Sequence, residues 1–509
     1  MLYRAPWTCG RFDEKSHSAI FYSLIDGLVY SFTEESADVV GLVLAVGRNG
    51  ALDEKHIADM TGIAIESIVE FLEELSSLNL VVTSIPTPEQ ELSYRTAVAS
   101  SRRGRSSNYD KTVKEKLPMF TEEAETEYTN RVGGITSVMF EMTYRCPEKC
   151  IHCYNPGATR NDSEISHRGD RKEMTLEDYK RVIDQLYEQG LYKVCLSGGD
   201  PFSHKAVWDV LDYLYSKEIA IDIFTNGQSI QRDVERIARY YPRLIGVSIY
   251  SGKAAEHDYV TRIKGSWERS MSVVKQFAAL AVPMNMKCCV MRPTLKHYYE
   301  VEQLAQEYGA QSQFEVSLCD SIENDACVSK YLRLTEEQLE VVLRDSNVPL
   351  YIGKEAPNYG GQKREMNAPL CGAGKNSFCI SPEGYLMPCC AFHLELGNVR
   401  IQSVAEIIET SIELKDIRTT TYGKTDECGT HEYCDYCNMC PGKNYSERGS
   451  YLKASHIGCW QAKVRYNLAC KMQHGYDPLN GYSLVERISQ LDSKIQHNIQ
   501  QEFVPVDEN

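Results

Sequence analysis

The chain has 509 residues and a formal net charge of -16 at pH 7, with 42% hydrophobic and 25% charged residues. These values are ordinary for globular proteins, so they exclude a disordered chain and a membrane protein as a class, and the length allows about two to four domains. The acidic balance also argues against nucleic acid as a partner, because a protein that binds phosphates needs clustered positive charge.

The 19 cysteines are the unusual part of the composition. No apolar run approaches the roughly 18 residues of a membrane span, and the N-terminus lacks the apolar core of a signal peptide, so we expect no membrane partner and a cytoplasmic location. Thiols stay reduced there, and so many of them indicate metal or redox chemistry rather than disulfides. Seven cysteines are scattered, and the other twelve fall in two blocks, 146–153 and 371–459.

Residues 1–85 are predicted to form a small winged-helix-like domain. Two strands are expected around Asp26 and Gly27, a pair that is typical of a hairpin turn, and a helix should follow within 36–50. Residues 53–82 then predict a helix, a turn, a second helix with one apolar face and a final strand. Residues 1–83 hold 5 Lys or Arg against 13 Asp or Glu, so this domain would repel phosphate groups.

Residues 86–133 show no such pattern. They are rich in Ser, Thr, Pro and charged residues. This composition predicts a linker, or a segment that is ordered only against a partner.

Residues 134–330 alternate between strands and helices. Six strands are predicted, at 137–144, 193–199, 219–227, 244–252, 282–291 and 312–320, and helices are expected at 175–190, 205–218, 232–241, 267–280 and 298–309. This alternation predicts an α/β fold with a parallel sheet, either open or partly closed as a barrel. Function in such folds collects at the loops that follow the carboxyl ends of the strands.

Three cysteines with a rare spacing, Cys146, Cys150 and Cys153, directly follow the first of these strands. Three thiolates so close together suit an iron-sulfur cluster, whereas a structural zinc site prefers four protein ligands. His152 is the obvious fourth candidate, but its position between two of the cysteines directs its side chain away. Three ligands to a four-iron cluster leave one iron open for a substrate or cosubstrate.

Residues 136–320 resemble the radical S-adenosylmethionine (SAM) enzymes, whose Cys-x3-Cys-x2-Cys loop follows the first strand of a partial (β/α)6 barrel. The resemblance implies that SAM binds the open iron and that one electron from the reduced cluster yields a 5'-deoxyadenosyl radical. It also implies that Arg262 pairs with the SAM carboxylate, that Ser248 contacts the ribose and that Tyr154 lies near the adenine. The other SAM-binding residues that it implies are Ser197, Gly198, Gly199, Asp200, Pro201, Thr225 and Asn226.

The second cysteine block lies in residues 371–470, where few long stretches show a periodic pattern of apolar residues. Such a segment forms little hydrophobic core and needs other stabilising links, such as bound metals. Its pattern resembles the SPASM extension, a C-terminal domain of radical SAM enzymes that often act on peptides or proteins. The resemblance implies two auxiliary 4Fe-4S clusters. One would be held by Cys371, Cys389 and Cys440, and the other by Cys428, Cys434, Cys437 and Cys459.

The match to the SPASM pattern leaves three alternatives open. The pattern expects a cysteine where His431 stands, so either His431 or the nearby Cys434 is the ligand. The first auxiliary cluster either has an open iron or is closed by Cys379 or Cys390. A single structural zinc in "CDYCNMC" would be the simplest alternative to the second cluster.

The predicted architecture is thus an α/β partial barrel between an N-terminal winged-helix-like domain and a cysteine-rich iron-sulfur domain, with a bridging region at 331–370 and a C-terminal helix and tail at 471–509. Radical SAM peptide maturases often carry an N-terminal leader-peptide recognition element of similar shape. The resemblance therefore implies a maturase that installs a thioether, a carbon-carbon crosslink or an epimerised residue in a ribosomally made precursor peptide. An external flavodoxin- or ferredoxin-type electron donor would serve it.

Two other functions stay open at this point. One is oxidation of a cysteine or serine in a folded protein, as in anaerobic sulfatase maturation. The other is an iron-sulfur redox sensor that binds DNA. No catalytic base or hydrogen donor is assigned. Cys319, Tyr250 and Lys287 are candidates for residues that face the barrel interior, but we expect a packed core position for each.

Overall fold

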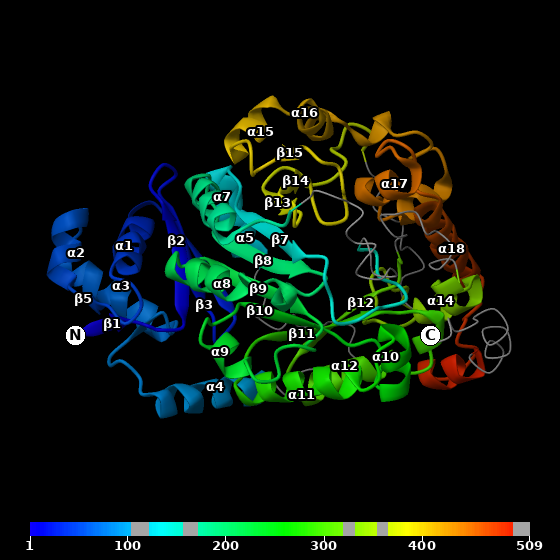
Figure 1. The fold of residues 1–509 in the computed structure, drawn as a ribbon, viewed down its shortest axis with the longest axis horizontal. Coiled ribbons are helices and arrows are strands. Elements are labelled where there is room, and N and C mark those ends of the chain that lie inside the picture. The colour runs from blue at the N-terminus through cyan, green and yellow to red at the C-terminus, as the bar shows by residue number, and fades with distance from the viewer. Residues whose placement is uncertain (103–121, 156–171, 319–330, 354–364, 492–509) are drawn as a thin grey trace.

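The structure is a computed structural model that describes residues 1–102, 122–155, 172–318, 331–353 and 365–491. The N-terminal domain lies at one end of the long axis with the partial barrel next to it, and the cysteine-rich C-terminal part extends over the barrel to the other end (Figure 1). All the described cysteines are free thiols. Within the described ranges, every helix is too short or too polar to cross a bilayer.

The N-terminal domain contains two three-stranded sheets and three helices. One sheet joins β1 (Leu2–Arg4), β5 (Ala51–Leu52) and β6 (Val81–Val82). The other is an antiparallel meander of β2 (Thr8–Asp13), β3 (Ser18–Ser23) and β4 (Leu28–Thr33). The helices are α1 (Glu34–Ala45), α2 (Glu54–Thr61) and α3 (Ile65–Ser77). The predicted hairpin, its helices and the final strand are present, whereas β1, β2 and β5 were not predicted.

Strand β3 joins two hydrophobic cores because its side chains alternate between the faces of the meander. Ala19 and Phe21 pack with the helices of the N-terminal domain. Ile20 and Tyr22 point the other way and pack against Tyr192 and other barrel residues. The domain is therefore docked on the barrel through a buried apolar face.

Two helices occupy much of the segment at 86–133 that the composition predicted to be a linker. These are α4 (Pro88–Arg102) and α5 (Glu122–Val132), while residues 103–121 lie outside the described part of the chain. Ala124, Tyr128 and Val132 lie on one face of α5 and pack into the core between the meander and the barrel. The linker prediction is wrong for these stretches, because a short apolar stripe was overlooked among polar residues.

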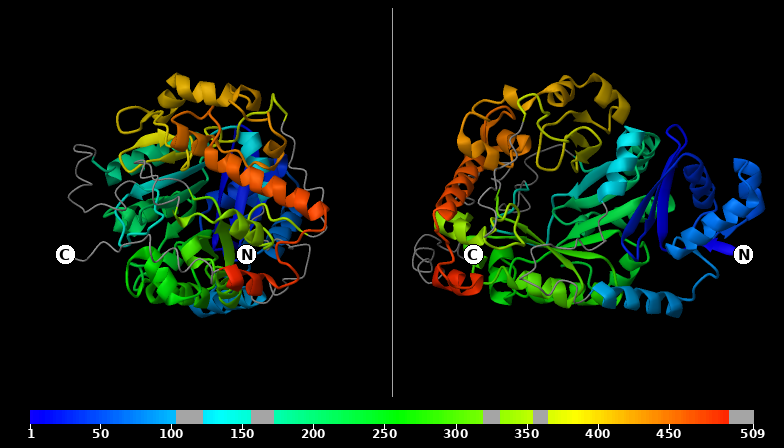
Figure 2. Two further views of the ribbon diagram at one scale, coloured as in Figure 1. Left: turned by 90° about the vertical axis from the view of Figure 1, so that its right-hand side faces the viewer. Right: turned by 180° about the vertical axis from the view of Figure 1, so that it is seen from behind.

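Polar contacts also fix the N-terminal domain and α5 to the barrel. Glu125 of α5 accepts a hydrogen bond of 2.7 Å from the Tyr22 hydroxyl and forms ion pairs with Lys193 and Arg243. Helix α4 runs along the underside of the barrel (Figure 2), where the Arg95 guanidinium donates to the carbonyl of Leu280 at 3.4 Å. Lys193 and Arg243 stand at the amino ends of barrel strands, so the domain docks at the end opposite the cysteine loop.

All six strands predicted for the barrel are present and pair in parallel, in the order β12-β11-β10-β9-β8-β7. They are β7 (Ser137–Thr143), β8 (Lys193–Gly198), β9 (Ala220–Thr225), β10 (Leu244–Ser248), β11 (Met284–Cys289) and β12 (Gln311–Glu315). The outer helices are α7 (Leu176–Glu188), α8 (Val207–Ser216), α9 (Val234–Ala238), α10 (Ala254–Thr261), α11 (Ser266–Ala279) and α12 (Glu300–Glu307). Only α10 was not predicted as a helix.

The barrel strands present one face to the helices and the other to the lumen. On β7, Phe140 and Met142 belong to the large core beneath the helices, which places Glu141 on the lumen face. On β8, Val194 and Leu196 belong to the same core, so Cys195 is on the lumen face. The lumen is therefore lined by the more polar half of each strand.

The cysteine-rich part shares its sheet with the barrel. Strand β13 (Ser377–Ile380) pairs in parallel with β7, and β14 (Tyr385–Met387) and β15 (Gly397–Asn398) extend the sheet to nine strands. Its helices are α15 (Val404–Thr410), α16 (Ile412–Thr419), α17 (Pro441–Arg448) and α18 (His456–Gln473). The boundary predicted at 470 is wrong because it falls inside α18, which packs against α14 (Glu336–Val342) of the bridging region (Figure 1). Residues 484–491 of the predicted tail are helical.

Candidate active site

The loop with Cys146, Cys150 and Cys153 is held between β7 and the end of α10. The backbone N–H of Lys149 donates to the carbonyl of Thr261 at 3.0 Å, and that of Ile151 donates to Val260 at 2.9 Å. These bonds fix a loop that would otherwise span the barrel mouth without support. The three half-buried thiols are thereby kept at the carboxyl end of the first strand, where the sequence placed them.

Burial governs the acidity of these thiols. It raises the pKa of Cys146 to about 12 and that of Cys153 to about 11, and it raises the pKa of Cys150 as well. Metal ligation requires the thiolate, so a bound cation has to displace these protons. Three such thiols in one loop are a donor set that fits an iron-sulfur cluster. The His152 ring instead packs edge-on against Tyr250, with ring centroids 4.7 Å apart.

The "SGGDP" segment connects the cysteine loop to the next two strands. Asp200 is fully buried and accepts hydrogen bonds from the Thr225 hydroxyl at 2.6 Å and from the Asn226 N–H at 3.0 Å. The Asn226 side-chain amide in turn donates to Cys146 Sγ at 3.2 Å. Gly199 lies so close to the loop that a Cβ would stand 2.4 Å from the carbonyl oxygen of Arg145. The structure therefore brings the predicted SAM residues of β8 and β9 directly to the first cysteine.

The later cysteines separate into two groups. Burial raises the pKa of Cys389 to about 12, and the neighbouring Cys390, Cys440 and Cys371 raise it further. Burial likewise raises the pKa of Cys459 to about 12, and its neighbours there are Cys437, Cys428 and Cys434. These neighbours are the cysteines that the resemblance assigned to each auxiliary cluster, with Cys390 added beside the first group, and their roles as ligands stay predictions.

His431 and Cys434 have different surroundings. The His431 ring stacks on Tyr433, with centroids 4.8 Å apart and 16° between the planes. Cys434 is among the thiols that surround Cys459. This geometry favours Cys434 as the ligand. Among the described residues, no three His, Cys, Asp or Glu side chains gather closely enough for a single metal ion.

Two parts of the chain match known protein families. Residues 140–305 match the radical SAM superfamily, and residues 371–441 match SPASM, an iron-sulfur cluster-binding domain. The chain combines a radical SAM domain with a SPASM domain. These domains bind 4Fe-4S clusters and SAM, so the cofactor class expected from the sequence is confirmed.

Curated relatives cover the same domains at low identity. The chain is 23% identical over 309 residues to the antilisterial bacteriocin subtilosin biosynthesis protein AlbA of Bacillus subtilis, a match that covers 59% of this chain and 66% of AlbA. It is 24% identical to an AdoMet-dependent heme synthase of Methanosarcina barkeri, covering 62% and 94% of the two chains. It is 22% identical to a PqqA peptide cyclase of Methylocella silvestris, covering 65% and 85%.

Solved structures share the fold of the radical SAM and SPASM domains. The structure of Streptococcus suis SuiB bound to precursor peptide SuiA aligns with a TM-score of 0.50 at 14% identity, covering 90% of this chain and 100% of that one. Native anSMEcpe with bound AdoMet and a peptide aligns with a TM-score of 0.50 at 16% identity, covering 71% and 99%. The predicted fold class is therefore confirmed.

The other predicted SAM contacts of the radical SAM domain surround the cysteine loop. Arg262 follows α10 in a left-handed conformation, with a φ of 57°, and its side chain is exposed beside the loop. Tyr154 is 37% exposed, and its ring lies 6.2 Å from that of His393. Ser248 ends β10. Their contacts with SAM stay predictions, whereas Asp200, Thr225 and Asn226 are connected to Cys146 by hydrogen bonds.

Asp200→Ala is expected to destabilise the radical SAM domain and to lower SAM cleavage. The change leaves the buried Thr225 hydroxyl and the Asn226 N–H without their acceptor, which costs about 3 kcal/mol in the free energy of unfolding. Urea denaturation measures that loss. Chromatography of 5'-deoxyadenosine measures SAM cleavage, which should fall because Asn226 is no longer held in place beside Cys146. Asp209→Ala, at an exposed position of α8, is the matched control. Equal behaviour of the two variants would contradict this role.

A hollow in the SPASM domain lies beside the second group of cysteines. It is lined by Cys428, Cys437 and Cys459 of that group, by Cys440 of the first group, and by Lys443 and Arg465. The Arg465 guanidinium is buried and donates to the carbonyl of Tyr436 at 2.6 Å. Thiols and two cations around one hollow suit a group with negative charge, as a thiolate-bound cluster has. These residues therefore fit an auxiliary cluster.

Glu141 is a lumen residue whose importance the sequence did not indicate. It is 1% exposed, its Oε2 accepts a hydrogen bond of 3.0 Å from the Tyr144 hydroxyl, and its Oε1 has no partner among the described residues. Burial raises the pKa of this carboxyl group to about 7. The only signal in the sequence was a charged residue at an alternate position of an apolar strand.

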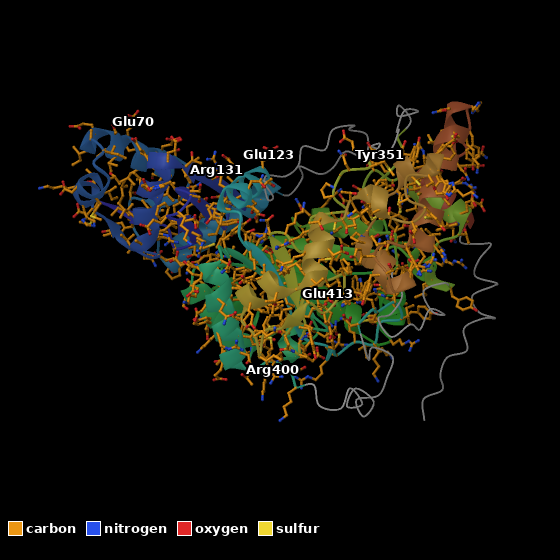
Figure 3. The ribbon with its side chains drawn as sticks, turned by 90° about the horizontal axis from the view of Figure 1, so that it is seen from above. Glu70, Glu123, Arg131, Tyr351, Arg400 and Glu413 are labelled. Atoms are coloured by element: carbon orange, nitrogen blue, oxygen red, sulfur yellow. The ribbon has the colours of Figure 1, made fainter. Side chains whose placement is uncertain are left out.

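The Glu141→Gln variant is expected to lose less stability than the wild type when the pH is raised. Because the folded-state pKa of about 7 lies above the value of 4.5 in the unfolded chain, this group stabilises the fold fully below pH 4.5, and the contribution is lost as the pH rises through 7. Urea denaturation at pH 5 and pH 9 should show that the wild type loses up to roughly 3 kcal/mol more than the variant. Glu123→Gln, at an exposed position of α5 (Figure 3), is the control. The same pH dependence in all three proteins would refute the assignment.

Proposed function

We propose that this chain is a radical SAM maturase that modifies a ribosomally made precursor peptide, by a thioether or carbon-carbon crosslink or by epimerisation. The observation that carries the proposal is the order of its parts, a small domain with strands and helices, a radical SAM barrel and a SPASM domain. Relatives named for subtilosin biosynthesis and for PqqA peptide cyclisation support a peptide substrate, as does a fold shared with SuiB bound to its precursor peptide.

The N-terminal domain offers a surface for an extended peptide. Strand β4 pairs with β3, and no described strand pairs with its other edge. Helix α3 lies beside it, with the rings of Phe32 and Phe71 in edge-to-face contact at 6.0 Å. Ile65 and Val69 of α3 are exposed at 41% and 37%. An open strand edge next to an apolar helix face accepts a peptide by β-augmentation, which is the role proposed here for the precursor's leader.

The position of this domain constrains how a peptide reaches the reactive site. The domain docks at the amino ends of the barrel strands, whereas the cysteine loop lies at their carboxyl ends. A bound leader therefore needs a spacer that runs along the barrel before the modified residue enters the lumen. Tethering raises the local concentration of that residue without tight binding at the lumen itself.

The chain's own residues position the cofactors and the substrate. Cys146, Cys150 and Cys153 would hold the cluster that leaves an iron open to SAM, and Asp200 and Asn226 keep the SAM pocket aligned with the first of these thiols. When bound and reduced, the cluster and SAM supply a radical that takes a hydrogen atom from carbon. The barrel wall keeps water away from that chemistry, and a flavodoxin- or ferredoxin-type donor is the proposed source of the electron.

A second candidate is oxidation of a cysteine or serine in a protein, the alternative of the sulfatase-maturase type. The shared fold with anSMEcpe, whose chain is covered to 99%, favours it. That alignment covers 71% of the present chain, so it leaves a substantial part of this protein without a counterpart. A leader-binding role for the N-terminal domain would account for such an addition, and we therefore favour the first candidate.

Co-expression with the small open reading frame next to the gene tests the proposal. We expect a mass change in that peptide that depends on the leader and on Cys146. The paired variant Ile65→Asp and Val69→Asp should reduce conversion at least about tenfold by weakening two apolar contacts. Ile412→Asp, at another exposed isoleucine that lies on α16, is the control. Deletion of residues 1–85 is a poorer test, since it uncovers the apolar surface around Tyr192.

Two results would contradict the proposal. One is an unmodified peptide from protein that still cleaves SAM, combined with oxidation of a folded target protein. The other is equal conversion by the α3 variant and the control, which would remove the leader-binding role.

A further inference from the structure

Lys287 is a cation in the barrel lumen for which the described part of the chain supplies no ion-pair partner. Its neighbours on β11, Met286 and Cys288, belong to the core beneath the helices, so its own side chain is on the lumen face. The expectation of a packed core position is wrong, because the residue is only half-buried. Within the described part of the chain, its ammonium forms no ion pair, and Nζ lies 3.1 Å from the centroid of the Phe224 ring.

The lumen is shaped to hold this side chain in place. Gly246 of β10 lies between Lys287 and Phe224, and a Cβ there would stand 2.8 Å from Lys287 Cε and 2.7 Å from the Phe224 ring. Glycine at this position thus lets the lysine lie across β10 onto the ring of β9. A contact between the ammonium and a ring is worth much less than an ion pair with a carboxylate in such a place.

The charged and titratable groups that face Lys287 do not neutralise it. They are Cys195, Asp222, Cys289 and Cys390, and burial lowers the pKa of the ammonium despite them. Asp222 is already engaged by Arg243, whose Nε donates to Oδ1 at 2.8 Å. This carboxylate is therefore paired with an arginine at the amino end of the barrel.

Two other polar groups of the lumen also have an oxygen without a hydrogen-bond partner among the described residues. Asn285, one lumen position below Lys287 on β11, donates from Nδ2 to Gln313 Oε1 at 3.2 Å, but its buried Oδ1 has no partner among the described residues. Glu141 Oε1 is likewise buried without a hydrogen-bond partner among the described residues. A donor and two acceptors left open in one lumen are typical of a site that a polar ligand completes.

We propose that Lys287 binds an anionic group of the peptide residue that enters the barrel, either a carboxylate or a thiolate. The register supports this site, since Lys287 pairs with Ser248 of β10, the position predicted to contact the SAM ribose. The proposed anion site and the predicted SAM contact therefore belong to neighbouring strands. The inference rests on the proposed function for the peptide nature of the ligand, whereas the site itself is a property of the lumen.

Saturation-transfer NMR on the full-length, anaerobically reconstituted protein with saturating SAM tests this site. The probes are the α-amides of N-acetyl-L-aspartate and N-acetyl-L-cysteine, and the neutral α-amide of N-acetyl-L-asparagine is the comparison. We expect a signal from at least one anionic probe that exceeds the asparagine signal several-fold, and the two arms distinguish carboxylate from thiolate. Lys287→Met should remove this excess, Lys287→Arg should keep it, and Lys55→Met, at an exposed position of α2, should not change it.

Labelling of Lys287 by acetic anhydride provides a second measurement that does not depend on a variant. The preferred anionic probe should slow acetylation of Lys287 several-fold and leave that of Lys55 unchanged, whereas the asparagine probe should protect neither. Equal signals from all three probes, an excess that survives Lys287→Met, or no protection of Lys287 would overturn the inference. None of these results would affect the mass change of a co-expressed peptide, so failure of the site and failure of the proposed function are distinguishable.

Discussion

Replacing Cys146, Cys150 and Cys153 together with alanine is expected to reduce SAM cleavage to background. These thiols are the only cysteines of the loop after β7, and burial keeps them protonated unless a cation binds. Without them the radical SAM domain has no donor set at the barrel mouth, so no electron reaches SAM there. Chromatography of 5'-deoxyadenosine from anaerobic, dithionite-reduced protein measures the effect.

The control for this triple variant is Cys470→Ala, which removes a cysteine outside the three ligand groups. Far-ultraviolet circular dichroism should show the same secondary structure in both variants. Cleavage that survives in the triple variant at a rate near that of the control would show that another group of residues activates SAM.

Iron content is expected to fall in two independent steps when the two later groups of cysteines are broken. Cys389→Ala disrupts the first group and Cys459→Ala the second, because each thiol lies among the other members of its own group. Each change should remove roughly four iron atoms per chain, and the double variant should lose roughly eight. Anaerobic reconstitution followed by iron and sulfide analysis measures these losses.

The same analysis decides between His431 and Cys434. His431→Ala should leave the iron content near that of the wild type, because its ring stacks on Tyr433, whereas Cys434→Ala should lower it like Cys459→Ala. If the double variant of Cys389 and Cys459 lost no more iron than either single variant, the two groups would form one site and the assignment would be wrong.

The barrel could be predicted from the sequence because its strands and helices are long enough to show their different hydrophobic periodicities. Every predicted barrel strand is present, and the Cys-x3-Cys-x2-Cys spacing placed the site at the end of the first one. Strand β13 could not be predicted, because it is short and its partner β7 precedes it by more than two hundred residues. Helix α5 was missed for a related reason. Its apolar stripe of Ala124, Tyr128 and Val132 acquires meaning only when the meander and the barrel face it.

Some residues of the candidate site could likewise be predicted from the sequence, whereas others could not. Asp200 and Asn226 were identified through the resemblance to radical SAM enzymes, whose SAM-binding segments follow the corresponding strands. The importance of Glu141 and Lys287 depends on the register between strands. The register determines which partners each side chain finds, and it places Gly246 where it leaves room for the lysine side chain. Local sequence contains no such information about contacts between strands. The docking of the N-terminal domain could not be predicted either, because it depends on contacts between residues far apart in the sequence, such as Glu125 and Arg243.

The electron paramagnetic resonance spectrum of the reduced protein, with and without SAM, is the most direct test of the account. The double variant of Cys389→Ala and Cys459→Ala simplifies the spectrum, because only the cluster at Cys146, Cys150 and Cys153 should then contribute to it. We predict a 4Fe-4S signal whose shape changes when SAM is added, since the loop leaves one iron without a protein ligand. A spectrum that stays the same with SAM, or the absence of a signal from reconstituted protein, would contradict the account.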